Sequence, residues 1–202
     1  PVENVRWFET LEFCARLSAY TQQENPALEF RLPSEAEWEY ACRAGTTTPF
    51  HFGPTITDQV ANYNASMTYG NGPKGEYREE TTEVGYFKKN KQEVANQFGL
   101  SDIHGNVWEW CMDSWLSNSN NASTDDSAGS NKNNCYRSAW AQILADWQAG
   151  QFDTQPAKKQ AQFLRGGSWG YLPGYCRSAN RSSLNRCKQD DDVGFRLACS
   201  RA

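Results

Sequence analysis

The sequence predicts an α+β domain that is rich in loops, and three observations support this fold class. Residues 5–20 and 33–43 carry apolar side chains at helical spacing. Residues 45–100 are rich in Gly, Pro, Asn and Thr, which is typical of long ordered loops with a few short strands. Residues 163–169 and 193–199 have the apolar character of buried strands. Because only two early helices precede these irregular segments, neither a doubly wound sheet nor a helical bundle fits.

The two early helices have recognisable faces and boundaries. The apolar face of the first comprises Trp7, Phe8, Leu11, Phe13, Cys14, Leu17 and Tyr20. In the second, Pro33 precedes Ser34, a good N-cap, and Glu37 three positions later completes a capping box. Gly45 is the expected stop signal of this second helix.

The middle of the chain is expected to be irregular. Segments such as 82–87 are candidates for the short strands. Residues 117–134 are polar and of low complexity, which predicts a surface insertion. Residues 138–149 form either a short helix or an irregular insertion. One face of that helix would carry Trp140, Ile143, Leu144 and Trp147.

The composition limits the class of protein. The 202 residues suit one domain, 1–202, which can bury about 70% of its unfolded surface. The net charge is −4 and the chain has no basic stripe, which argues against nucleic acid as a partner. No apolar run approaches the ~18 residues of a membrane span, so we expect no transmembrane segment in this chain. The chain begins close to its first predicted helix, and we expect the natural N-terminus, with a lipid anchor as one option, upstream of it.

The 7 cysteines leave two readings open. None forms a Cys-x-x-Cys pair, which argues against zinc-ribbon and thioredoxin-like sites. Several can be small buried hydrophobic residues with free thiols. Alternatively, two or three disulfides form in an oxidising compartment, and the odd number leaves at least one thiol unpaired.

Four motifs, spread in order over nearly the whole chain, carry a family resemblance. They are Arg31–Arg43 (RLPSEAEWEYACR), Leu100–Trp110 (LSDIHGNVWEW), Arg165–Trp169 (RGGSW) and Val193–Arg196 (VGFR). Together they resemble the formylglycine-generating-enzyme (sulfatase-modifying factor) superfamily. The resemblance implies a variant of the C-type lectin fold, with a small twisted antiparallel sheet, two helices and long ordered loops.

The same resemblance argues against catalysis. The enzymes of the superfamily hold copper between two cysteines just after the Gly-Gly-Ser motif, a thiolate pair that suits Cu(I). In this chain Tyr171 stands at the first position and only Cys176 remains, either at the second position or, counted back from Arg181, near a structural cysteine. We therefore expect neither copper nor oxidase activity. Related iron enzymes use several histidines, whereas this chain has only His51 and His104.

The C-terminal part is similar to the variable proteins of diversity-generating retroelements, of the treponeme type. The likeness lies in Leu164–Trp169, Cys176–Arg181 and Val193–Arg196. In such proteins adenine-rich codons, mostly for Asn, are randomised between constant motifs, which implies a variable region over 169–192 here.

The residue types in this region pass a permissive test. A randomised AAY codon cannot encode Lys, Gln, Glu, Met or Trp, and 170–175 and 182–187 contain none of these. Lys188 and Gln189 fail the test, which places them outside the randomised set.

The predicted ligand site consists of two segments. The first comprises Trp169, Gly170, Tyr171, Leu172, Pro173, Gly174 and Tyr175, and the second Ser182, Ser183, Leu184, Asn185, Arg186, Cys187, Asp190 and Asp191. Tyr-, Ser- and Gly-rich loops are typical of binding surfaces. Core packing explains Trp169 equally well and is also the alternative for Leu184, an ordinary polar loop explains Ser182, Ser183, Asn185 and Arg186, and a solvated acidic run explains Asp190–Asp192.

The resemblance also implies a structural calcium site. Asp102, Gly105, Val107 and Glu109 match the family's ligands at the same offsets. Carboxylate and backbone carbonyl oxygens are what calcium prefers. The alternative is that this segment only folds its loop onto the core.

Carried over from the enzymes, two disulfides are expected. They are Cys14–Cys199 and Cys42–Cys176, with Cys111–Cys135 as a further option across the polar insertion. Each of the first two would close a long loop, which contributes about 3–5 kcal/mol. Cys187 would remain free.

Three functional hypotheses follow. The preferred one is a non-catalytic, surface-displayed or extracellular binding protein whose C-terminal region is diversified, with a protein or other surface ligand that differs between variants. The second is a copper-dependent formylglycine-generating oxidase or related sulfatase-modifying enzyme. The third is a structural or regulatory member of the superfamily that is not diversified.

Overall fold

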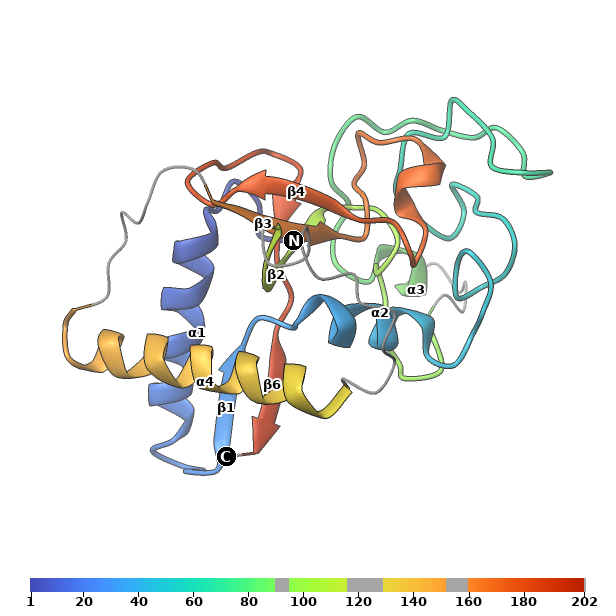
Figure 1. Ribbon diagram of the computed structural model, residues 1–202. Coiled ribbons are helices and arrows are strands. Elements are labelled where there is room, and N and C mark those ends of the chain that lie inside the picture. Colours follow the sequence, from blue (N-terminus) through green and yellow to red (C-terminus); the bar gives the residue numbers. More distant parts are fainter. Residues whose placement is uncertain (90–94, 116–128, 152–159, 202) are drawn as a thin grey trace.

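The computed structural model describes residues 1–89, 95–115, 129–151 and 160–201 (Figure 1). The chain begins with helix α1 (Trp7–Thr21), strand β1 (Leu28–Arg31) and helix α2 (Glu35–Arg43), close to the two expected helices. The buried face of α1 includes Trp7, Phe8, Leu11, Cys14 and Ala15. Phe13 and Tyr20, which were expected on that face, are 47% and 70% exposed because they lie beside the buried stripe.

The capping box of α2 is confirmed. The backbone N–H of Glu37 donates to Ser34 Oγ (3.2 Å), and the backbone N–H of Ser34 donates to Glu37 Oε2 (2.9 Å). The helix ends at Arg43, its C-cap Ala44 is left-handed with φ 44°, and the expected stop signal Gly45 follows the cap with a φ of 90°.

Two sheets organise the rest of the chain. The larger sheet has the order β4-β3-β2-β5, and its strands are β2 (Trp108–Ser114), β3 (Ala161–Arg165), β4 (Ser182–Asn185) and β5 (Val193–Gly194). Its β3 pairs antiparallel with β2 and β4, whereas β5 runs parallel to β2. The second sheet pairs β1 antiparallel with β6 (Ala198–Arg201), beside α1 in Figure 1. The strand β4, within the predicted variable region, is therefore an edge strand.

Three expected elements differ from the structure. The strand expected over 163–169 ends at Arg165, because Gly166 and Gly167 have φ values of 100° and 76° and turn the chain. The strand expected over 193–199 is split between β5 and β6, with 195–197 between them. The segment 82–87 forms no strand, and its end enters the one-turn helix α3 (Tyr86–Lys89).

Of the two alternatives for 138–149, a short helix and an irregular insertion, the structure shows the helix, and it is longer than expected. Helix α4 (Gly129–Gln148) includes the last residues of the predicted insertion 117–134, so its part from Gly129 onward is helical rather than loop; 117–128 lie outside the described residues. Trp140 is fully buried, and the partly buried Ile143, Leu144 and Trp147 pack against the main core. No helix of the described residues is long and apolar enough to cross a membrane.

The core holds the RGGSW motif against α2. The main cluster joins α1 to the sheet, and a second cluster under α2 contains Trp38, Cys42, Ile103, Cys111 and Phe163. Arg165, which is fully buried, donates to the Glu39 carboxylate and to the backbone oxygens of Ser178 and Asn180. These bonds fix the stretch between the two predicted ligand segments to helix α2.

Candidate functional site

The first predicted ligand segment forms a tight turn and the short 3-10 helix η3 (Pro173–Cys176). A Cβ at Gly167 would lie 2.6 Å from Cys176 Sγ and 2.9 Å from its Cα, so only glycine lets η3 approach the Gly-Gly-Ser turn this closely. His104 fixes the other side, because its Nδ1 lies 2.7 Å from Cys176 O and its Nε2 accepts the N–H of His51 (3.1 Å). Both contacts fit a neutral imidazole with the proton on Nδ1, and burial lowers the pKa of His104 to about 3.

This anchoring leaves three large side chains on the surface. Tyr171, Leu172 and Tyr175 are 42%, 40% and 47% exposed, whereas Pro173 and Cys176 are buried beneath them. The rings of Tyr171 and Tyr175 meet edge to face with centroids 5.3 Å apart. We call Tyr171, Leu172 and Tyr175 the Tyr171 patch. An exposed apolar group on a rigid support has the character of a contact surface.

Trp169 lies between the core and this surface. It is partly buried, and its backbone N–H donates to Asn106 O (3.0 Å). Its ring stacks with Tyr77 at 6.4 Å, a neighbour that the sequence motifs did not indicate. Its indole N–H is buried and has no hydrogen-bond partner among the described residues. Both the packing role and the ligand role expected for Trp169 are therefore compatible with its position.

The second segment is held by the sheet. In β4, Ser182 pairs with Leu164, and all four side chains of the strand are partly buried. Leu184 packs against the main core, and the guanidinium of Arg186 lies 5.2 Å from the ring of Phe8. Leu184 and Arg186 thus have partners within the chain, which favours a supporting role for them.

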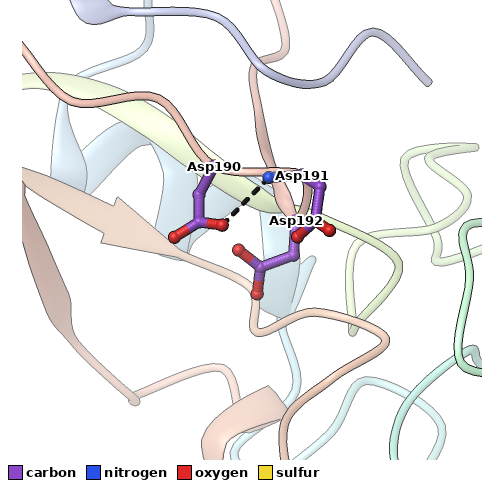
Figure 2. Close-up of side chains that lie close together, drawn as sticks. All are labelled: Asp190, Asp191 and Asp192. Carbon is purple, nitrogen blue, oxygen red and sulfur yellow. Dashed lines mark hydrogen bonds between the residues drawn. The ribbon is translucent and has the colours of Figure 1, made fainter.

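The turn after β4 is more exposed. Asn185 Oδ1 accepts the N–H of Cys187 (2.9 Å), and Cys187, Asp190 and Asp191 are exposed. Figure 2 shows Asp190, Asp191 and Asp192 side by side, with the N–H of Asp191 donating to Asp190 Oδ1 (3.0 Å). Asp192 is the buried member; its Oδ2 accepts the Ser168 hydroxyl (2.5 Å), and burial raises its pKa.

Trp108 connects the two segments. Its backbone N–H donates to Asp192 O (2.8 Å), and its ring meets that of Tyr171 edge to face at 5.3 Å. Burial and the carboxylates of Asp192 and Asp190 raise the pKa of Tyr171. The structure therefore brings the Tyr171 patch and Asp190–Asp192 together. The side chains of β4 (Ser182–Asn185) belong to the sheet and are not part of this surface.

Three of the four predicted calcium ligands line one pocket, but an arginine holds one of them; the fourth, Gly105, is not in the lining and donates its N–H to Gly166 O (2.8 Å). Asp102, Val107 and Glu109 line a pocket of about 360 Å³ that also contains Arg196. The Glu109 carboxylate accepts Arg196 Nε and a terminal guanidinium nitrogen (2.6 and 2.7 Å) and Trp38 Nε1 (2.6 Å). Asp102 Oδ2 accepts the N–H of Gly85 (2.6 Å). Calcium here remains a prediction, and it would compete with Arg196 for Glu109.

Neither Cys14–Cys199 nor Cys42–Cys176 is bonded among the described residues. Cys14, Cys42, Cys111, Cys176, Cys187 and Cys199 are all free thiols, and the Cys135 side chain lies outside the described residues. Cys14, in α1, is fully buried, whereas Cys199, in β6, is exposed. Cys42 Sγ instead lies 3.4 Å from Ser178 Oγ and 3.8 Å from His104 Nε2.

Cys176, the one cysteine after Gly-Gly-Ser, is poorly suited to nucleophilic chemistry. It is fully buried, and burial raises its pKa to about 12. A protonated, inaccessible thiol neither attacks a substrate nor binds a soft metal well.

Comparisons with known proteins agree with the motifs. Residues 1–201 match the sulfatase-modifying factor enzyme 1-like domain. The formylglycine-generating enzyme of Streptomyces coelicolor is 31% identical over 176 residues, covering 83% of this chain and 46% of that enzyme. That of Mycobacterium tuberculosis is 41% identical over 87 residues, covering 40% of this chain and 26% of the enzyme. The chain spans about half or less of the length of the first curated relatives it matches.

Solved structures show the same fold over the whole chain. Treponema denticola variable protein 1 has a TM-score of 0.63 and 26% identity, covering 100% of this chain and 71% of that one. PvdO from Pseudomonas aeruginosa has a TM-score of 0.63 and 25% identity, covering 100% and 62%. The expected α+β, C-type-lectin-like fold and the likeness to a variable protein are thereby confirmed. The chain belongs to the formylglycine-generating-enzyme, or sulfatase-modifying factor, family.

Proposed function

We propose that this chain is a non-catalytic ligand-binding member of its family, whose binding surface lies in the variable region 169–192. The observation that carries the proposal is the replacement of the first active cysteine by the exposed Tyr171, above a buried Cys176. The chemistry of a thiol pair is lost at this position, while a contact surface is present.

Diversification of this region by a retroelement is the second part of the proposal. The side chains of the Tyr171 patch are 40–47% exposed, and of their contacts with the core only that of Tyr171 with the Trp108 ring is described, whereas Gly167, Pro173 and Cys176 anchor the backbone beneath them. The backbone pairing of β4 with β3 does not depend on side-chain identity. Replacement of the exposed residues therefore leaves the fold intact, and the likeness to Treponema denticola variable protein 1 supports this reading.

The partner and location follow from this proposal. A diversified surface suits a protein or other surface ligand that changes between variants, met outside the cell or at its outer surface. A lipid anchor upstream of residue 1 would hold the domain there. Structural calcium at Asp102, Gly105, Val107 and Glu109 would require Glu109 to leave Arg196.

Sequencing of the 3′ end of the gene and its downstream DNA, from many isolates or passaged cells, tests the proposal. We expect substitutions confined to codons for 170–175 and 182–192, at positions that are adenine in a nearby template repeat. A 3′ end that is invariant and has no template repeat would contradict diversification and favour a member of the family with a constant surface.

The second candidate is a copper-dependent formylglycine-generating oxidase, because relatives of that name are 31–41% identical to this chain. The purified protein would be tested for stoichiometric Cu(I) binding and for oxidation of a cysteine-containing peptide, with Cys176→Ser as the matched control. We expect no activity from either protein; activity that disappears in Cys176→Ser would establish the oxidase instead.

A further inference from the structure

We propose that the surface formed by the Tyr171 patch and Asp190–Asp192 recognises a positively charged side chain, an arginine or lysine presented by a protein partner. This inference rests on the proposed ligand-binding function and deepens it by naming the chemistry of the partner.

The aromatic and acidic groups share one supporting network. Ser168 donates its hydroxyl to Asp192 Oδ2 (2.5 Å), and its backbone oxygen accepts the N–H of Tyr171 (3.2 Å). Trp108 donates its N–H to Asp192 O (2.8 Å) and places its ring 5.3 Å from that of Tyr171. Two buried residues thus hold Asp192 and Tyr171 in fixed relation, and carboxylate oxygens of Asp190 and Asp191 lie within 4.8 Å of an Asp192 oxygen, so the surface is organised before any partner arrives.

The acidic side of this surface lacks an internal counter-charge. One carboxylate oxygen from each of Asp190, Asp191 and Asp192 lies within 4.8 Å of the others (Figure 2). None of the three forms an ion pair with a lysine or arginine of the part of the chain that the structure describes. Like charges this close repel one another, and a cation placed beside them relieves that repulsion.

The aromatic side selects among cations. Tyr171 and Tyr175 are more than 40% exposed and meet edge to face, so ring surface is open to a partner. A guanidinium or alkylammonium group gains both a cation–π contact with a ring and charge-assisted hydrogen bonds to carboxylates. A bare metal ion would use the carboxylates alone and would leave the tyrosines without a role. The juxtaposition therefore favours a basic side chain.

Titration of the ¹⁵N-labelled protein followed by NMR provides the test. The probes are the peptides acetyl-Gly-Arg-Arg-Gly-amide and acetyl-Gly-Lys-Lys-Gly-amide, with citrulline and acetyl-lysine versions as neutral counterparts. We expect saturable shifts at the amides of Gly170, Gly174 and Asp190–Asp192 with at least one charged peptide and none with its neutral counterpart. Asp190→Asn/Asp191→Asn should weaken binding about tenfold, whereas the equally charged control Glu24→Gln/Glu29→Gln should not.

Other results would overturn the inference. Equal shifts with the neutral peptides, or none with either charged peptide, exclude recognition of a basic group. Shifts of the same amides by CaCl₂ with no response to the peptides would assign the aspartates to a metal. Tyr171→Ala, which removes an exposed ring, should also weaken peptide binding; unchanged affinity contradicts the aromatic part. The sequencing of the 3′ end of the gene tests the proposed function in a separate experiment. A failure of peptide binding can therefore be distinguished from a failure of the proposed function.

Discussion

Replacement of Glu109 by glutamine is expected to destabilise the protein, because this buried carboxylate neutralises the partly buried guanidinium of Arg196. Glu109 lies at the start of β2, and its side chain is only 5% exposed. It accepts two hydrogen bonds from Arg196 and one from the Trp38 indole. The other oxygens near the Arg196 guanidinium are the backbone carbonyls of Ser101 and Asp102, at 3.3 and 3.4 Å, which are weak acceptors at those distances.

The magnitude follows from burial. Removal of one partner of a fully buried ion pair costs about 3–5 kcal/mol, but the Arg196 side chain is 24% exposed and keeps part of its hydration, so we expect a loss of about 2–4 kcal/mol. For a chain of this length about 1 kcal/mol corresponds to about 2–4 °C, so Tm should fall by about 4–16 °C. Glu9→Gln is the matched control, because the Arg6–Glu9 pair has side chains that are 49% and 42% exposed, and such pairs contribute about 1 kcal/mol or less.

Urea unfolding and calorimetry give the free energy of unfolding and the Tm of both variants. A double variant isolates the interaction between Glu109 and Arg196: Glu109→Gln combined with Arg196→Met should lower the free energy of unfolding by less than the sum of the two single changes. A free energy of unfolding of Glu109→Gln that lies within about 1 kcal/mol of the wild-type value would refute the reasoning. A wild-type Tm that rises with CaCl₂, and does so only when Glu109 is intact, would show that calcium displaces Arg196 from this carboxylate.

Three further experiments, a substitution, a thiol-labelling reaction and a pH titration, test how η3 is anchored to the residues around it. Gly167→Ala places a methyl group 2.6 Å from Cys176 Sγ at a φ of 76°, and should cost about 2 kcal/mol or more in urea unfolding. Iodoacetamide at pH 8 should label the exposed Cys187 and Cys199 while Cys176, whose pKa burial raises to about 12, stays unmodified in the mass spectrum. Burial lowers the pKa of His104 to about 3, below its unfolded value of about 6.5, so stability should fall as pH drops from about 6.5 towards 3. A His104→Gln variant should lose part of this pH dependence.

Each of these three predictions has an outcome that would contradict it. Wild-type stability of Gly167→Ala would mean that η3 moves without cost. Rapid alkylation of Cys176 in the folded protein would show that it is accessible, and would revive a catalytic role. An identical pH profile for His104→Gln would assign the acid sensitivity to other groups.

Much of the architecture was predictable from local signals. The capping box at Ser34 and Glu37 specified the start of α2, since it depends only on side chains three residues apart. The helical face of Trp140, Ile143, Leu144 and Trp147 likewise identified part of α4. The strand expected over 163–169 was too long, because apolar character does not reveal that Gly166 and Gly167 take left-handed conformations.

The candidate site was predictable only as a pair of segments. Motif positions indicated that Tyr171 replaces a cysteine, which needs no knowledge of contacts. The sequence did not indicate that Tyr77 stacks on Trp169, or that Leu184 turns into the core, because both depend on residues distant in the chain. The disulfide pairing carried over from the enzymes stays a prediction, because the described cysteines are free thiols in this structure and Cys14 is buried whereas Cys199 is exposed.

The sequence by itself determined the family, the fold class, the early helices and the loss of the thiol pair, because motifs and periodicity are properties of the chain order. Tertiary structure decided which partner each charge has. Arg196 holds Glu109 at one end of the sheet, whereas Asp190–Asp192 remain without a described basic partner beside exposed tyrosines. These outcomes depend on burial and on distances between residues far apart in sequence, which spacing along the chain does not encode.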